Sequence, residues 1–162
     1  LTYMRRAGEI LGQANAAAVR ATVPGAFEGD IAAEFNRVLL EQGADICAEP
    51  NWPLGAGQKS LLVRHTTGRG YVSENDQVLF EPGVAYRHYN VANMYTVLTG
   101  PKVDGRHIDM HAACVAALDS VQALIRPGNT FAQLYAEHRR GLEDFGFGHA
   151  ALLACGYPMG AM

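Results

Sequence analysis

Two residues in the middle of the chain have side chains whose type and setting suit acid–base chemistry. His65 follows the strand-like stretch SLLVR, and its neutral imidazole could take a proton from water and return it to a leaving nitrogen near pH 7. Glu81 is the one carboxylate in LFEPGVAYRHYNVANMYTVLTG, Leu79–Gly100. It could hold a substrate ammonium or amidinium, orient His65, or act as a nucleophile. We therefore predict His65 and Glu81 as catalytic residues.

Both residues also have ordinary structural explanations. His65 could be a partly buried histidine that bonds to the backbone. Glu81 stands on an otherwise apolar strand, where burying an unpaired acid is costly, so it would face a cleft or a partner. Because Pro82-Gly83 follows, Glu81 could equally be an exposed residue at the end of a strand. The residues alone leave these alternatives open.

Polar and aromatic residues cluster after Glu81. Alternation along a strand would put Tyr86 and His88 on one face, and Arg87 and Tyr89 on the other. Arg87 could bind a substrate carboxylate through two parallel hydrogen bonds, whereas Tyr89 could equally pack within the sheet. Asn93, a neutral amide, lies four residues after Tyr89. We predict that five residues contact the substrate: Tyr86, Arg87, His88, Tyr89 and Asn93.

The remaining histidines give little sign of a metal site. His107 and His111 are four residues apart in a helical stretch, which is a possible spacing for a metal pair. The pattern has no glutamate in the arrangement of His-Glu-x-x-His motifs. We interpret both as surface residues near the start of a helix, with Asp104 as its N-cap. We predict neither a metal nor another cofactor.

The composition excludes several classes of protein. With 162 residues, 49% hydrophobic and 18% charged, the chain is typical of one soluble globular domain. A net charge of −3 argues against nucleic acid as a partner. No apolar run approaches the ~20 residues that span a bilayer. Three widely spaced cysteines form no CxxC, which favours reduced thiols in the cytoplasm.

The elements that would position the candidate residues are helical pairs and strands. In residues 45–100, glycine and proline residues separate short apolar runs, which is typical of strands and turns. Residues 79–100 are expected to form two strands around a turn at Gly83. Apolar residues elsewhere recur at helical spacing. We predict four helices, over residues 3–23, 24–44, 104–125 and 129–146.

The two helical pairs repeat each other. Pro24-Gly25 and Pro127-Gly128 are 103 residues apart, and so are Gly43 and Gly146. Any two amphipathic helices after a Pro-Gly break share some residues, but the agreement of the breaks favours a duplication. Each half would be two helices followed by a β-hairpin. The first half covers 1–100, whereas the second, 101–162, lacks its hairpin, so we expect a chain cut within the fold.

This arrangement resembles the pita-bread fold, an α+β fold found in creatinase, ectoine hydrolase, Xaa-Pro aminopeptidases, prolidase and methionine aminopeptidases. Four patterns carry the resemblance: the first two helices (RRAGEILG to EQGAD), His65 sixteen residues before Glu81, the strand pair QVLFEPG to TVLTG, and ACGYPMG, which resembles a Gly-His-Gly-x-Gly turn. The resemblance covers essentially the whole chain. It implies that residues 1–162 form a single catalytic-type domain.

The sequence departs from this family at its metal ligands. In the metal-dependent members, two aspartates eleven residues apart share two cations. Here the first position is Glu81, the second is Ala92, and the turn histidine is Tyr157. Alanine offers no ligand, and tyrosine is a poor one beside carboxylates. The pattern resembles creatinase and ectoine hydrolase, the metal-free members of the family.

The resemblance implies a metal-independent hydrolase that cleaves a C–N bond in a small polar or zwitterionic compound. His65 would transfer the proton, Glu81 would assist it, and a further carboxylate would come from the absent hairpin. Two alternatives stay open: a metal-dependent Xaa-Pro aminopeptidase or dipeptidase, and a non-catalytic binding protein. Relatives form dimers, so a homodimer is expected for the full-length protein.

Overall fold

The chain folds into two compact units. A computed structural model of the protein describes residues 1–47, 55–57, 70–152 and 154–161, so that His65 lies outside the described residues. The first unit comprises Leu1–Lys102 with Met159–Met162, and the second comprises Val103–Pro158. In the described part of the chain, no helix has the length and apolar character needed to cross a membrane.

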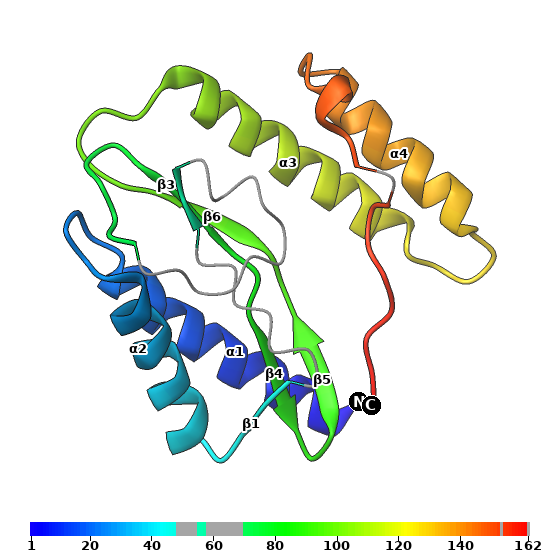
Figure 1. Ribbon diagram of the computed structural model, residues 1–162. Coiled ribbons are helices and arrows are strands. Elements are labelled where there is room, and N and C mark those ends of the chain that lie inside the picture. Colours follow the sequence, from blue (N-terminus) through cyan, green and yellow to red (C-terminus); the bar gives the residue numbers. More distant parts are fainter. Residues whose placement is uncertain (48–54, 58–69, 153, 162) are drawn as a thin grey trace. The chain divides into compact units, whose positions relative to one another are not determined.

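Two helices form one layer of the first unit, α1 (Thr2–Ala21) and α2 (Glu28–Glu41). They pack against each other, and α1 also contacts strands β4 and β5 (Figure 1). The face that α1 buries is mostly alanine, and these small side chains let neighbouring backbones approach closely. The helices and strands share one core: Ala7, Ile10, Leu11, Ala14, Ala18, Ile31, Phe35, Leu39, Ala44, Val72, Val78, Phe80 and Val84.

The strands of the first unit form two small antiparallel sheets. Their orders are β1-β4-β5 and β2-β3-β6. The strands are β1 (Asp45–Ile46), β2 (Gly55–Ala56), β3 (Gln77–Phe80), β4 (Gly83–Tyr86), β5 (Tyr89–Ala92) and β6 (Tyr95–Leu98).

The four strands from β3 to β6 form one long hairpin with a break in each arm. Phe80 pairs with Tyr95 before the breaks and Gly83 pairs with Ala92 after them, so the register continues unchanged. The predicted turn at Gly83 is therefore wrong, because Gly83 begins β4. The chain turns at Arg87 and His88, whose φ angles of 53° and 66° are those of a tight two-residue turn.

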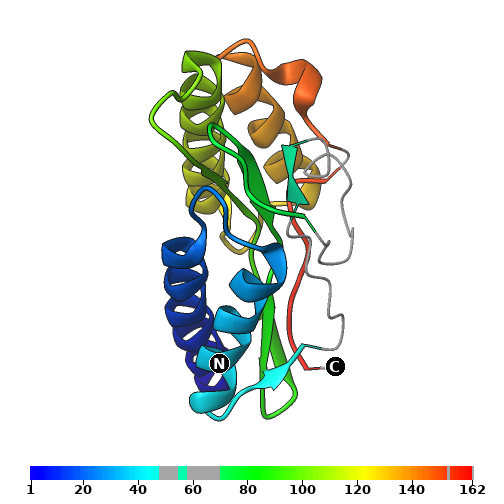
Figure 2. The same ribbon diagram turned by 60° about the vertical axis from the view of Figure 1, so that its left-hand side comes forward.

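A second helix pair forms most of the second unit. It consists of α3 (Gly105–Leu124) and α4 (Phe131–Glu143), followed by the short 3-10 helix η2 (Gly148–Ala150). Asp104 caps α3 as predicted, since its side chain accepts a hydrogen bond from the Arg106 N–H at 2.9 Å. Figure 2 shows α3 and α4 lying alongside each other.

The structure confirms the duplication of the helix pair. Helices α1 and α3 begin 103 residues apart and have the same length of 20 residues. The glycines of the two interhelical turns have the same left-handed backbone, with φ of 87° at Gly25 and 97° at Gly128. The glycines that end the pairs also match, with φ of 71° at Gly43 and 80° at Gly146. The four predicted helices are confirmed.

A surface ion-pair motif is repeated at the same offset. Arg37 bonds to the carboxylates of Glu34 and Glu41, three residues before it and four after it. Arg140 makes the same two pairs in α4, with Glu137 and Asp144. The arginine in each case lowers the pKa of the preceding glutamate through a hydrogen bond. Exposed pairs of this kind contribute little stability, so their value here is as evidence of the repeat.

Candidate functional site

The long hairpin has one face against α1 and one face away from it. Val84 is buried in the core with α1, and Val91, directly opposite it, packs against the same core. Side chains alternate along a strand, so the residues next to Val84 and Val91 in the sequence, and every second residue from these, lie on the face away from α1. That outer face includes Glu81, Gly83 and Ala92. Glu81 and position 92, where the metal-dependent members of the family have their second acid, therefore share one surface.

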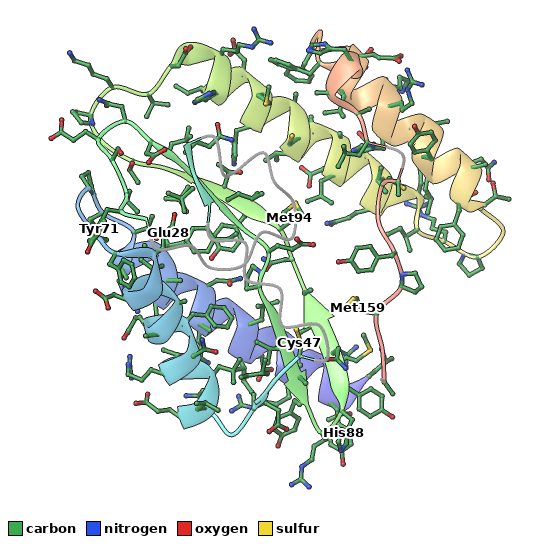
Figure 3. The ribbon with its side chains drawn as sticks, in the orientation of Figure 1. Glu28, Cys47, Tyr71, His88, Met94 and Met159 are labelled. Carbon is green, nitrogen blue, oxygen red and sulfur yellow. The ribbon has the colours of Figure 1, made fainter. Side chains whose placement is uncertain are left out.

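Glu81 lies in the break between β3 and β4, where the ladder is interrupted. The residue is half-buried, and its Oε2 atom is buried without a hydrogen-bond partner in the described part of the chain. A buried carboxylate oxygen is costly unless something bonds to it. The unbroken register places Met94 opposite Glu81, and Met94 is 49% exposed on the hairpin (Figure 3). Glu81 therefore has one buried carboxylate oxygen whose hydrogen-bonding capacity no other described residue uses.

The position of the family's second acid is an apolar surface. Ala92 pairs with Gly83, so two residues with little or no side chain lie next to each other. The Cys47 thiol reaches over Gly83, since a Cβ added there would lie 2.6 Å from its Sγ (Figure 3). Sequence reasoning assigned Cys47 no place in the site. Gly83 was the residue that could have predicted this contact, because a glycine within a strand often marks the close approach of another group.

Asn93 lies on the opposite face from Glu81. Its Oδ1 accepts a hydrogen bond from the Asn15 side chain of α1 at 3.2 Å, and the Tyr95 hydroxyl bonds to the same Asn15 at 3.4 Å. The Tyr95 ring stacks on Phe80 at 4.8 Å, and burial raises the pKa of the Tyr95 hydroxyl. The Asn93 side chain is therefore directed toward α1, and its predicted contact with substrate stays a prediction.

Tyr86 and Tyr89 lie on the same face, which contradicts the predicted alternation. They pair across the hairpin, because the turn at the two residues between them reverses the chain. Both rings pack on Tyr3 of α1, with ring centroids 6.0 and 5.6 Å apart. Both tyrosines pack on α1 in this arrangement, and their predicted contact with substrate stays a prediction.

Arg87 and His88 occupy the exposed tip of the hairpin, and His88 is marked in Figure 3. They are therefore not strand residues on opposite faces, as alternation predicted. The tip is held by Asn90, whose side chain donates to the His88 carbonyl at 3.1 Å. The Asn90 N–H also donates to the Gly160 carbonyl at 2.8 Å, which attaches the end of the chain to β5. The predicted roles of Arg87 and His88 in binding substrate stay predictions.

The described residues do not form the donor set of a two-metal centre. Within them, no group of three or more histidine, cysteine, aspartate or glutamate side chains is placed to hold a metal ion. Ala92 cannot be a ligand, and the Tyr157 side chain is 66% exposed. His107 and His111 stand on α3 as an isolated pair. One acid at Glu81 does not make a dinuclear site.

Comparison with known proteins identifies the family. Residues 2–162 match metallopeptidase family M24. The chain belongs to metallopeptidase family M24. It is 27% identical over 141 residues to the Xaa-Pro aminopeptidase of Escherichia coli (strain K12), and 24% identical over 160 residues to the Xaa-Pro dipeptidase of Pyrococcus furiosus. These alignments cover 85% and 99% of this chain, but only 31% and 45% of the two relatives.

A solved structure has the same fold. The prolidase from Pyrococcus furiosus superposes with a TM-score of 0.90 at 21% sequence identity. The match covers 98% of this chain and 47% of that one, so the M24 chain described here spans about half of its relative. The predicted fold, the α+β pita-bread fold with a duplicated helix pair, is confirmed.

Proposed function

We propose that the full-length protein is a metal-independent hydrolase that cleaves a C–N bond in a small polar or zwitterionic compound. The observation that carries this proposal is the pairing of Ala92 with Gly83 beside Glu81. Two carboxylates would have to meet there to share cations, and only one is present. The coarser conclusion, a hydrolase of the M24 kind, is supported by the relatives, both of which are Xaa-Pro peptidases.

In the proposed reaction, His65 takes a proton from water as the water oxygen attacks the substrate carbon. The C–N bond then breaks, and His65 returns the proton to the leaving nitrogen. Glu81 supports this step by holding the substrate's cationic group or by stabilising the charged imidazole. Its buried oxygen without a described partner supports a role of this kind.

A second candidate function is a metal-dependent Xaa-Pro aminopeptidase or dipeptidase. The names of the two curated relatives favour it. It requires a metal site built from Glu81 and ligands in the rest of the full-length protein, without an acid at position 92. A non-catalytic binding protein is a third possibility that the loss of ligands would equally explain.

Several features of the full-length protein are part of the same proposal. We expect a cytoplasmic homodimer with a small-molecule substrate and no nucleic-acid or membrane partner. Residues 1–162 would belong to one catalytic-type domain, although the described residues divide into two units.

The deciding experiment uses the full-length protein purified without chelator. Bound Mn, Co, Fe and Zn are quantified, and hydrolysis of small amides, amidines and Xaa-Pro dipeptides is assayed before and after dialysis against a chelator. Less than about a tenth of an equivalent of metal, with activity on a small amide or amidine unchanged, is expected from the donor set. Near-stoichiometric metal, with dipeptidase activity lost on chelation, would replace the proposal with the second candidate.

The role of Glu81 is tested in the same assay with a matched pair of variants. Glu81→Gln removes the charge from the outer face and is expected to lower kcat by about 100-fold or more, as loss of an acid–base partner does. Glu74→Gln makes the same change at an exposed acid in a turn and is expected to leave kcat unchanged. Equal kcat of both variants, with the fold intact, would contradict a catalytic role for Glu81, whereas no hydrolysis of any tested compound by the parent protein would favour the binding-protein alternative.

A further inference from the structure

Three residues form a row across the outer face of the first unit, next to Glu81. The register in which β1 pairs with β4 brings Cys47, the residue after β1, opposite Gly83. On the other side of β4, Gly83 pairs with Ala92 of β5. Neighbouring strands lie about 4.8 Å apart, so Cys47, Gly83 and Ala92 are neighbours on one surface.

Of these three residues, only Cys47 has a side chain longer than a methyl group. A Cβ built on Gly83 would lie 2.6 Å from the Cys47 Sγ and 3.1 Å from the Cys47 Cβ, so the sulfur fills the space directly above the glycine. Cys47 is half-buried, and Figure 3 marks it beside the hairpin. Because a thiol behaves as a small apolar group, Cys47 forms an apolar wall at one end of the row.

Glu81 lies close to this row. It stands two residues before Gly83 on the same face, which corresponds to about 7 Å along an extended chain. Its Oε2 atom is buried and bonds to no other described residue. In the reaction proposed above, this carboxylate can hold the cationic group of the substrate. The substrate atoms next to that cationic group would then lie over Gly83 and Ala92, with the Cys47 thiol at their side.

The row suits an apolar part of the substrate better than a polar one. Gly83 and Ala92 have no polar side-chain atom, and a thiol is a weak donor and a weak acceptor. A hydroxyl or a second charge placed against these three residues would lose hydrogen bonds to water without replacing them. A short alkyl group loses none.

We propose that Cys47 is a specificity-determining residue that limits the size of the substrate next to Glu81. A short alkyl group of the substrate lies over Gly83 and Ala92 and contacts the thiol, whereas a longer or branched group collides with Sγ. This inference rests on the proposed function and adds the chemical class of the substrate. The compound carries a small apolar substituent close to its cationic nitrogen.

Kinetics of the full-length protein with a series of substrates test this assignment. The series starts from whichever amide, amidine or Xaa-Pro dipeptide the parent hydrolyses, and it lengthens the substituent next to the cationic nitrogen from methyl to ethyl and propyl. Cys47→Ala removes the sulfur. It is expected to raise kcat/KM for the propyl compound relative to the methyl compound by about 10-fold or more, as expected for added space in an apolar site.

Two further variants make the test specific. Cys47→Val places more volume above Gly83 and is expected to shift the preference the opposite way, toward the methyl compound, by about 10-fold. Cys114→Ala makes the same change as Cys47→Ala at an exposed cysteine of α3 and is expected to leave the preference of the parent unchanged. Melting temperatures of all three variants show whether each one folds.

The outcomes separate this inference from the function on which it rests. Opposite shifts in Cys47→Ala and Cys47→Val, without a shift in Cys114→Ala, support it. An active parent whose order of preference is kept in Cys47→Ala would overturn the specificity role and leave the hydrolase proposal intact. An equal loss across the whole series, with a lowered melting temperature, would assign Cys47 a structural role only. A parent that hydrolyses no tested compound would overturn both.

Discussion

Ala92 stands directly opposite Gly83 in the hairpin, on the same face as Glu81. In the metal-dependent relatives that the sequence resembles, an aspartate at this position would share cations with the first acid. Here two residues with little or no side chain lie beside one carboxylate, with the Cys47 thiol over Gly83. Residues that are diagonal neighbours on one face of a sheet are close enough for long side chains to meet. The geometry for a shared site is present although the second acid is not.

Restoring that acid is expected to create cation affinity. In full-length Ala92→Asp, two carboxylates would be diagonal neighbours on the outer face, which favours hard divalent cations. Titration calorimetry with Mn²⁺ or Co²⁺ should show tighter binding to this variant than to the parent protein.

The matched control for this variant is Asn93→Asp. It adds the same charge one residue away, but on the face toward α1, where the side chain bonds to Asn15. It should leave cation binding unchanged. Equal gain of binding in both variants would mean that the effect is only one of added negative charge.

Gly83→Ala is expected to destabilise the protein. The new Cβ would lie 2.6 Å from Cys47 Sγ and 3.1 Å from Cys47 Cβ, so the Cys47 side chain would have to shift. Overpacking of this kind costs about 1–3 kcal/mol of unfolding free energy, measured by urea denaturation. Adding Cys47→Ala should restore much of the loss, and an additive double mutant would contradict the contact.

Gly8→Ala is the contrasting control. Gly8 lies within α1, and a Cβ there meets nothing within 4 Å. Replacing glycine by alanine in a helix stabilises by roughly 0.5–1 kcal/mol. Gly83→Ala should therefore lower the free energy of unfolding, and Gly8→Ala should raise it.

The hairpin tip can be made more stable. Arg87 and His88 have φ of 53° and 66°, a region that side chains other than glycine and asparagine adopt at a cost. The double variant Arg87→Asn with His88→Gly supplies the residues that this type of turn prefers. We expect a gain of about 1 kcal/mol in unfolding free energy, measured by urea denaturation. If instead stability falls, the two original side chains must make contacts that outweigh the strain.

Stability at alkaline pH should depend on Tyr95. Burial raises the pKa of its hydroxyl in the folded protein, whereas in the unfolded chain tyrosine titrates near pH ~10. The unfolded state therefore loses a proton first, so this contribution to stability is present below about pH 10 and is lost as the pH rises above it. Tyr95→Phe should flatten the fall in melting temperature above this pH. Tyr71→Phe, at a ring that is 66% exposed, should not.

Helix positions and the repeat were predictable from the sequence because both depend on local patterns. Glycine at Gly25 and Gly128 marks the interhelical turns, and apolar spacing defines the helices between the breaks. The strands were predicted less well. Period-two alternation indicates an extended chain, but it does not show where that chain reverses. Without Asn-Gly or a similar pair, the turn at Arg87 and His88 had no local signal.

The candidate site was predictable only in part. The sequence by itself determined the family's fold, the presence of Glu81 and the lack of an acid at position 92, because each follows from residue types at fixed spacing. Tertiary structure alone decided which residues share a face with Glu81. It directed Asn93 toward α1, packed Tyr86 on Tyr3 and brought Cys47 over Gly83. Register and turn geometry control these contacts, and both depend on pairing between residues distant in the chain.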